Sequence, residues 1–397
     1  MPKSNKKPKK IYMDYAASAS PNPSSIHALG VEAKSKLKNA RNDVADVLGV
    51  RKEEIIFTSG GTESNNLAIQ GVIFGCWTPE DLVSNTRRLH IITTNIEHPS
   101  VLETFELLVK RKLVEITIVP VEINGIVDPK KIKKEIKKNT VLVSVMYANN
   151  EIGTIQPIKE IAKIIKYCRK INLSIFPFFH TDAVQAVNYL DLHVEKLGVD
   201  LLSLSGSKIE GSGRVGILYK RKNIKLVKVF GGGDQEYGLR PGTENLPEIL
   251  KFSRALKSVQ NIKEQETKRL INLRDYFIKQ LQKLPKQGFG ENLIVNGDLE
   301  NRLPNNINIT FPKIPSDLLV IELSARGIMA SAKSACKSWE SGGSYVIKAL
   351  HPKGNSQADP EIGGVRFSLG RDTTKKDIIY TIKVLSKILT KLKKWYN

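Results

Sequence analysis

Short runs rich in β-branched and aromatic residues alternate with amphipathic segments along the first half of the chain. Candidate strands cover residues 55–58, 90–94, 114–121, 140–147, 175–179 and 201–204, and candidate helices cover 64–74, 100–110, 129–138 and 157–170. This alternation predicts an α/β fold with a mostly parallel, doubly wound sheet and helices on both of its faces. Binding sites on such sheets lie at the carboxyl ends of the strands, so functional residues are expected directly after these runs.

The length of the chain allows one large and one smaller domain. With 397 residues, 41% of them hydrophobic, the chain can bury a sizeable core. We predict a basic N-terminal tail at 1–10, a large domain at 11–255 and a smaller α+β domain at 256–397. Residues 256–284 have the pattern of a long helix that connects the two domains.

Cysteine usage and hydropathy predict a cytoplasmic protein. Cys76, Cys168 and Cys336 share no metal-like spacing and cannot build a disulfide framework, which favours a reducing compartment and no metal site. No run approaches the roughly 18 apolar residues of a membrane span, so no membrane contact is expected. The net charge of +22 is spread along the chain without a nucleic-acid-binding motif, so we expect no nucleic-acid partner.

An apolar run at 199–204 leads into a Ser-Gly-Ser turn that ends on a lysine, Lys208. A strand followed by such a turn can hold one amine in a desolvated pocket, where it becomes a nucleophile toward carbonyl compounds. Upstream, another apolar run closes at Asp182. A pyridoxal 5'-phosphate enzyme requires such a pair, a lysine for a Schiff base and an aspartate for the pyridinium nitrogen. Each residue alone is more often a solvated lysine or a turn-forming aspartate.

A glycine loop follows the first candidate strand. Ser59-Gly60-Gly61-Thr62 leads directly into a helical pattern, so backbone N–H groups, the helix N-terminus and the Thr62 hydroxyl could together bind a phosphate. The loop is not a Walker loop, because no Gly-Lys-Ser/Thr follows. By itself it would more often be the cap of an ordinary helix.

Seven ordered motifs together resemble the cysteine desulfurases, which belong to the class V aminotransferase group of fold-type I pyridoxal-phosphate enzymes. The motifs are Ser-Gly-Gly-Thr-Glu-Ser-Asn-Asn (59–66), Glu97-His98, Asn149-Asn150-Glu151-Ile152-Gly153, Thr181-Asp182-Ala183-Val184-Gln185, Arg240-Pro241-Gly242-Thr243, Ser334-Ala335-Cys336 and Arg366-Phe367-Ser368. They span nearly the whole chain. The resemblance implies a fold-type I transferase with a mostly parallel, seven-stranded-type sheet, and a homodimer with active sites at its interface.

The resemblance also implies a role for each matching residue of the cofactor site. Lys208 would carry pyridoxal 5'-phosphate as a Schiff base and then remove the α-proton of bound cysteine. Asp182 would keep the pyridine nitrogen protonated, Gln185 would hydrogen-bond the phenolic oxygen, and His98 would stack on the ring and assist proton transfer. The phosphate would be held by Gly61, Thr62, Ser205, Ser207 and, from the partner subunit, Thr243.

Three further residues would handle the substrate. Arg366 matches the arginine that binds the carboxylate of L-cysteine, a task suited to a planar guanidinium, and Asn150 would make a second contact where cofactor and substrate meet. Cys336 would define the reaction, because its thiolate would attack the substrate sulfur to give a persulfide and L-alanine. Lys333 and Lys337 would favour that thiolate, whereas Cys76 and Cys168 are expected to be inert.

The chain departs from the family pattern at three places. Ser207 replaces the usual histidine before the lysine, which weakens the expected phosphate contact. Lys333 replaces the usual glycine of the cysteine loop, which makes that loop more cationic. The helix that relatives place between the elements at 14–17 and 22–27 is missing, so we expect the fold to survive with an altered entrance.

The resemblance therefore predicts a cysteine desulfurase whose sulfur passes to an acceptor protein for iron–sulfur cluster assembly or tRNA thiolation. Two alternatives stay open. A selenocysteine lyase would not need Cys336 to release selenium, and a catalytically weak dimer that binds pyridoxal phosphate could act mainly as a partner of the sulfur acceptor. Catalysis is favoured by the intact residues Lys208, Asp182, Cys336 and Arg366, whereas Ser207 and the missing helix favour the weak dimer.

Overall fold

A computed structural model describes residues 11–77, 88–284, 293–311, 314–332, 343–351 and 363–396. Its main element is a seven-stranded sheet with the strand order β1-β7-β6-β5-β4-β2-β3. The strands are β1 (Ile55–Thr58), β2 (Leu89–Thr94), β3 (Val114–Val119), β4 (Thr140–Ser144), β5 (Phe178–Asp182), β6 (Leu201–Ser205) and β7 (Gly216–Lys220). Strand β7 is antiparallel to both β1 and β6, whereas the other neighbouring pairs of this sheet are parallel. The predicted α/β fold with a mostly parallel sheet is confirmed.

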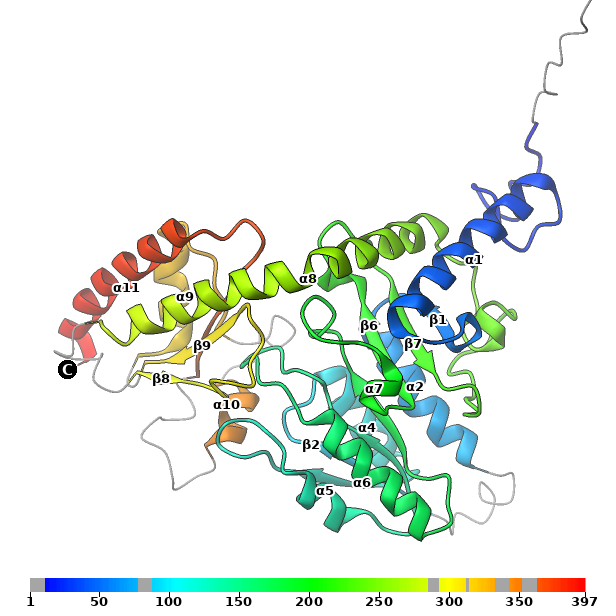
Figure 1. The fold of residues 1–397 in the computed structure, drawn as a ribbon, viewed down its shortest axis with the longest axis horizontal. Helices are drawn as coiled ribbons and strands as arrows, with labels where there is room; N and C mark the ends of the chain where they lie inside the picture. The colour runs from blue at the N-terminus through cyan, green and yellow to red at the C-terminus, as the bar shows by residue number, and fades with distance from the viewer. Residues whose placement is uncertain are drawn as a thin grey trace, which may run out of the picture.

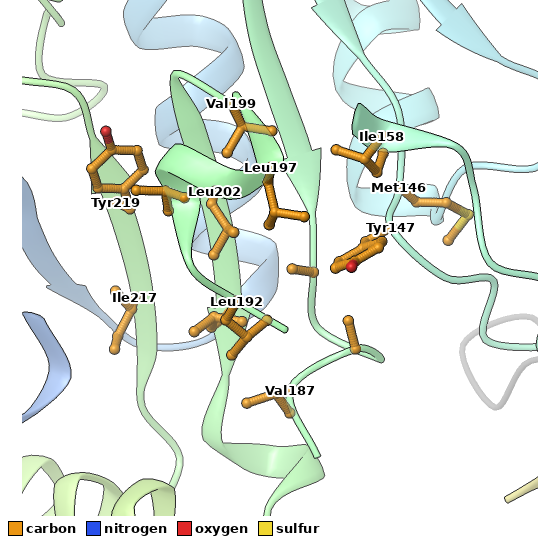
Figure 2. Close-up of a cluster of buried hydrophobic side chains, with 14 of the residues drawn as sticks. Met146, Tyr147, Ile158, Val187, Leu192, Leu197, Val199, Leu202, Ile217 and Tyr219 are labelled. Carbon is orange, nitrogen blue, oxygen red and sulfur yellow. The ribbon is translucent and has the colours of Figure 1, made fainter. Parts of the chain in front are cut away.

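Helices cover both faces of this sheet. One face packs against α1 (Ala28–Leu48), α5 (Pro129–Glu135), α6 (Ile158–Ile171), the short α7 (Val194–Leu197) and the first part of α8 (Leu246–Leu281). The other face packs against α2 (Gly61–Cys76) and α4 (Pro99–Lys110). Because neighbouring strand residues point to opposite faces, Leu201 lies in one core and Leu202 in the other. Figure 2 shows Leu202 beside Leu192, Leu197 and Ile217 in the core on the side of α1, α6 and α7.

A second, smaller sheet forms a separate core near the carboxyl end of the chain. Its strands β8 (Ile294–Val295), β9 (Asn306–Thr310) and β10 (Val365–Ser368) are antiparallel, in the order β10-β9-β8. Their core includes residues of α9 (Ser316–Ser324), α11 (Lys375–Tyr396) and the second part of α8, whereas α10 (Tyr345–Leu350) joins the first core.

Helix α8 belongs to both cores, and Figure 1 shows it running from the side of α1 to the side of α11. Ile249, Phe252 and Val259 lie in the first core, whereas Leu270 and Phe277 lie in the second. The Asn245 side chain caps this helix by accepting from the Glu248 N–H. The helix therefore begins ten residues before the predicted start at residue 256, and the proposed domain boundary falls inside it.

Other element boundaries also differ from the prediction. Strand β5 lies at 178–182 rather than 175–179, and β4 ends at residue 144 rather than 147. Strand β7 and helix α1 were not predicted. Where relatives would place the missing helix, Asp14 Oδ2 instead accepts from the Ser25 hydroxyl at 2.9 Å and lies 3.2 Å from His27 Nε2, which ties the N-terminal segment to the start of α1. Among the described helices, none is long and apolar enough to cross a membrane.

Candidate active site

A cavity of about 470 Å³ opens at the carboxyl ends of the parallel strands. Its walls come from the turns after β1, β2, β4, β5 and β6, as expected for a doubly wound sheet. The structure brings together there nearly all the residues predicted for the cofactor and the substrate: Gly61, Thr62, His98, Asn150, Asp182, Gln185, Ser205, Ser207, Lys208 and Arg366.

One end of the cavity is formed by the N-terminus of α2 and the turn after β6. A Cβ atom at Gly61 would lie 2.8 Å from Val184 Cγ2, so only glycine lets the helix approach this closely. The hydroxyl oxygens of Ser205 and Ser207 lie 2.9 Å apart, next to this helix end. Backbone N–H groups and hydroxyls thus meet at a helix N-terminus, which suits an anion.

The Asp182 carboxylate lies at the end of β5 and is 5% exposed. Its Oδ1 accepts from the Val184 N–H at 3.0 Å, and its Oδ2 accepts from Asn65 Nδ2 at 2.8 Å. Because the carboxylate can only accept, it fixes the orientation of the Asn65 amide. These two donors hold the carboxylate at the wall of the cavity.

A chain of hydrogen bonds joins this carboxylate to His98. Asn65 Nδ2 also donates to Ser100 Oγ at 2.8 Å, and Ser100 Oγ lies 2.8 Å from His98 Nδ1. His98 is the N-cap of α4, and its Nδ1 accepts from the Ser100 backbone N–H at 3.1 Å. Since a backbone N–H can only donate, Nδ1 carries no hydrogen and the proton of the neutral ring is on Nε2. Burial lowers the pKa of His98, which favours this neutral form.

Lys208 ends the 3-10 turn that follows β6 and lies between two cavities. The second cavity, of about 350 Å³, extends toward α8 and the smaller sheet and shares Asn150, Gln185, Lys208 and Arg366 with the first. The desolvated setting expected for this amine is not found, because Lys208 is exposed. The short turn leaves the lysine at the rim, where both cavities are open to solvent.

Arg366 reaches the site from β10 of the smaller sheet. Its Nη1 donates to the Asn150 carbonyl at 2.9 Å, and burial lowers the pKa of its guanidinium, an effect opposed by the negative charge of Glu151. Within the described residues, Asn150 Oδ1 is buried and has no hydrogen-bond partner. The site therefore offers a guanidinium and an uncommitted amide at the junction of the two cavities.

Glu97 lies beneath the site and was not assigned a function from the sequence. It is 0% exposed, and its Oε1 accepts from the Thr94 hydroxyl at 2.6 Å and from the Met146 N–H at 2.9 Å. Burial raises the pKa of this carboxyl to about 8 despite these donors, with the negative charge of Asp182 adding to the shift. This raised pKa favours the protonated acid at neutral pH.

Among the predicted site residues that the structure describes, Thr243 is not brought to this cavity. Thr243 is exposed and lines a separate cavity of about 130 Å³ beside Glu244 and Asn245. Cys336 and the neighbouring Lys333 and Lys337 lie outside the described residues. Of the other cysteines, burial raises the pKa of the Cys168 thiol, an effect that Lys133 opposes.

Three residues that line the site were assigned no role from the sequence: Asn65, Ser100 and Arg214. Asn65 could have been found, since it lies one turn after Gly61, on the same side of the helix, just before the apolar residues that begin at Leu67. Ser100 could have been read only as a helix-cap neighbour. No local signal distinguishes Arg214 from other surface arginines.

The comparisons with known proteins agree over nearly the whole chain. The family model described as Aminotransferase class-V matches residues 5–380. A cysteine desulfurase IscS of Dictyoglomus turgidum is 40% identical over 97% of this chain and 96% of its own, and one of Methanosarcina thermophila is 41% identical over 94% and 86%.

Solved structures show the same likeness. A NifS-like protein superposes with a TM-score of 0.80 at 34% identity over 94% of this chain and 92% of its own. The structure titled "SspA in complex with cysteine" superposes with a TM-score of 0.69 at 32% identity over 88% and 90%. The chain therefore belongs to the class-V aminotransferase family, among its cysteine desulfurases.

Proposed function

We propose that this chain is a pyridoxal-phosphate-dependent cysteine desulfurase that converts L-cysteine to L-alanine and holds the sulfur as a persulfide on Cys336. One observation carries the proposal: the residues required for the cofactor and for the substrate carboxylate converge on one cavity. The relatives named cysteine desulfurase, and a solved relative in complex with cysteine, support this choice of substrate.

The residues present fit pyridoxal 5'-phosphate. The Gly61 cradle, which a Cβ atom would fill, and the hydroxyls of Ser205 and Ser207 suit its phosphate. The buried Asp182 carboxylate suits a protonated ring nitrogen, and Gln185 and Lys208 line the space between the two groups. When bound, the cofactor supplies a sink for the electron pair released from the substrate.

The protein residues divide the remaining work. The Arg366 guanidinium and the Nδ2 group of Asn150 donate to the substrate carboxylate and so fix the position of the α-carbon. The Lys208 amine, at the junction of the two cavities, removes the α-proton. The neutral His98 carries its proton on Nε2, because its Nδ1 already accepts from the Ser100 N–H. Its Nε2 can therefore donate a hydrogen bond but cannot take up a proton. Proton removal therefore falls to Lys208 rather than to His98.

Sulfur transfer is the task of Cys336. Its thiolate attacks the substrate sulfur, the bond between that sulfur and the β-carbon breaks, and its electron pair stays with the β-carbon, which takes a proton to become the methyl group of alanine. Both described flanks of the segment that carries Cys336 are attached near the site. Ser331 pairs with the backbone of Arg366, and the Ser344 hydroxyl donates to Glu151.

We further propose a homodimer and an acceptor protein. Because Thr243 is exposed and does not reach the cavity of its own chain, it is available to the phosphate site of a second copy. The persulfide sulfur then passes to an acceptor protein for iron–sulfur cluster assembly or tRNA thiolation.

The decisive experiment measures alanine and protein-bound persulfide from L-cysteine. The parent should form both, Lys208→Ala should form neither, and Cys336→Ala should bind cofactor but form neither, with Cys168→Ala as the matched control that keeps activity. Normal turnover by Cys336→Ala would exclude the persulfide route and favour a lyase. If the parent binds cofactor but forms no alanine, with or without an acceptor, the result would favour the catalytically weak dimer over a desulfurase.

A further inference from the structure

The phosphate end of the cavity has too little positive charge for its ligand. Its donors are the α2 N-terminus and the neutral hydroxyls of Thr62, Ser205 and Ser207, whereas a phosphate monoester carries a charge of about −1.5 to −2 at neutral pH. Among the described residues that line this end, the Glu63 carboxylate is neutralised by Arg240, whose Nε lies 3.0 Å from Glu63 Oε1. The position before Lys208 supplies only the Ser207 hydroxyl.

Three lysine or arginine side chains line the cavity, and two of them have other tasks. Lys208 is the nucleophile, and Arg366 donates to Asn150 at the opposite end. The third is Arg214, which lines the cavity together with Ser205 and Ser207. Within the described ranges, no carboxylate forms an ion pair with the Arg214 guanidinium, since Glu248 accepts only from its backbone N–H, at 3.2 Å.

The backbone holds Arg214 next to the phosphate end. The Val215 carbonyl accepts from the Gly206 N–H at 2.7 Å, and Gly206 is the first residue of the turn that carries Ser207 and Lys208. On its other side, a Cβ atom at Gly206 would lie 2.5 Å from the Gly213 carbonyl oxygen. The residues before and after Arg214 therefore both contact this turn. The backbone itself places Arg214 beside the phosphate end.

We infer that Arg214 is the cationic contact for the phosphate of bound pyridoxal 5'-phosphate and takes over the charge that Ser207 does not provide. This inference rests on the proposed function only for the identity of the cofactor. A guanidinium offers two parallel N–H donors to a phosphate, which suits this task better than a hydroxyl.

The test compares cofactor release from the full-length holoprotein and its variants on dilution. A charge-assisted contact is worth about 1.5 to 3 kcal/mol, so Arg214→Gln should release pyridoxal phosphate about 10-fold to 100-fold faster than the parent. Lys222→Gln removes an equally exposed positive charge from beyond the far end of β7 and should release at the parent rate. Ser207→His should slow release when it is introduced into the parent. Introduced into Arg214→Gln it should restore retention, since the imidazole would replace the positive charge that the arginine supplied.

A second measurement separates a phosphate contact from damage to the fold. The affinity for pyridoxal, which lacks the phosphate, should be the same in Arg214→Gln and the parent. Equal loss of pyridoxal and pyridoxal phosphate, or release of pyridoxal phosphate at the parent rate, would overturn the inference. Neither readout needs turnover, so a protein that retains cofactor through Arg214 but makes no alanine would refute the proposed function alone.

Discussion

The buried carboxyl of Glu97 makes the stability of this protein depend on pH in a direction opposite to that of most carboxylates. Burial raises its pKa from the ordinary 4.5 to about 8, so the folded state binds this proton more tightly than the unfolded state. The resulting stabilisation is fully present below pH 4.5 and is lost as the pH rises to about 8. Between these limits the free energy of unfolding falls by about 1.4 kcal/mol for each pH unit.

Substitution of Glu97 by glutamine should remove this slope. Its side-chain oxygen can still accept from Thr94 and Met146, and its amide stays neutral at every pH used. From pH 5.5 to 7.5, the variant should therefore gain about 2.7 kcal/mol relative to the parent. Urea unfolding at saturating cofactor measures this difference, with Glu106→Gln on the exposed side of α4 as the control for loss of one carboxylate. Parallel pH curves for the parent and Glu97→Gln would show that Glu97 is ionised in the folded state.

Three further outcomes are expected. Arg366→Gln should raise KM for L-cysteine at least about tenfold with a smaller change in kcat, because it loses a charged contact to the carboxylate; a change in kcat alone would argue against substrate binding. Ser100→Ala should raise the pKa of His98, since it removes a hydroxyl donor to Nδ1 of the neutral ring; nitrogen NMR of histidine-labelled protein, assigned with His98→Gln, detects this shift, and an unmoved His98 would refute it. Arg41→Met should lower the free energy of unfolding in urea by about 3 to 5 kcal/mol, because it leaves the buried Glu236 without its ion pair. Adding Glu236→Leu to this variant should restore at least half of the lost stability. No recovery would mean that lost packing, not the unpaired charge, causes the loss.

The sequence predicted the sheet where its strands are apolar and bounded by turns, and it was less accurate where packing overrides local pattern. Residues 175–179 look like a strand, but the chain enters the sheet only at Phe178, after Pro177. Strand β7 is bracketed by glycines and lysines, and only its antiparallel pairing between β1 and β6 makes it a strand. The early start of α8 had a local signal, the Asn245 cap followed by Pro247, which the apolar period alone does not show.

The site was predictable to the extent that its chemistry lies in motifs. Asp182 and Lys208 follow strand ends, so the fold brings them together without further information. Ser100 and Arg214 could not be found in the same way, because their roles depend on contacts between segments far apart in sequence. Thr243 shows the remaining limit, since within its own chain it lines a separate cavity.

The 36-residue helix α8 joins the two cores that carry the substrate site. At 1.5 Å per residue it is about 54 Å long, and Lys208 is carried by the core at one end of it while Arg366 is carried by the core at the other. A bend of about 5° at its midpoint would move either end by about 2 Å relative to the other half. Because Val259, Ile262 and Lys263 of this helix line the cavity that Lys208 and Arg366 share, a kink there would change the distance between these two side chains and so the size of substrate that fits.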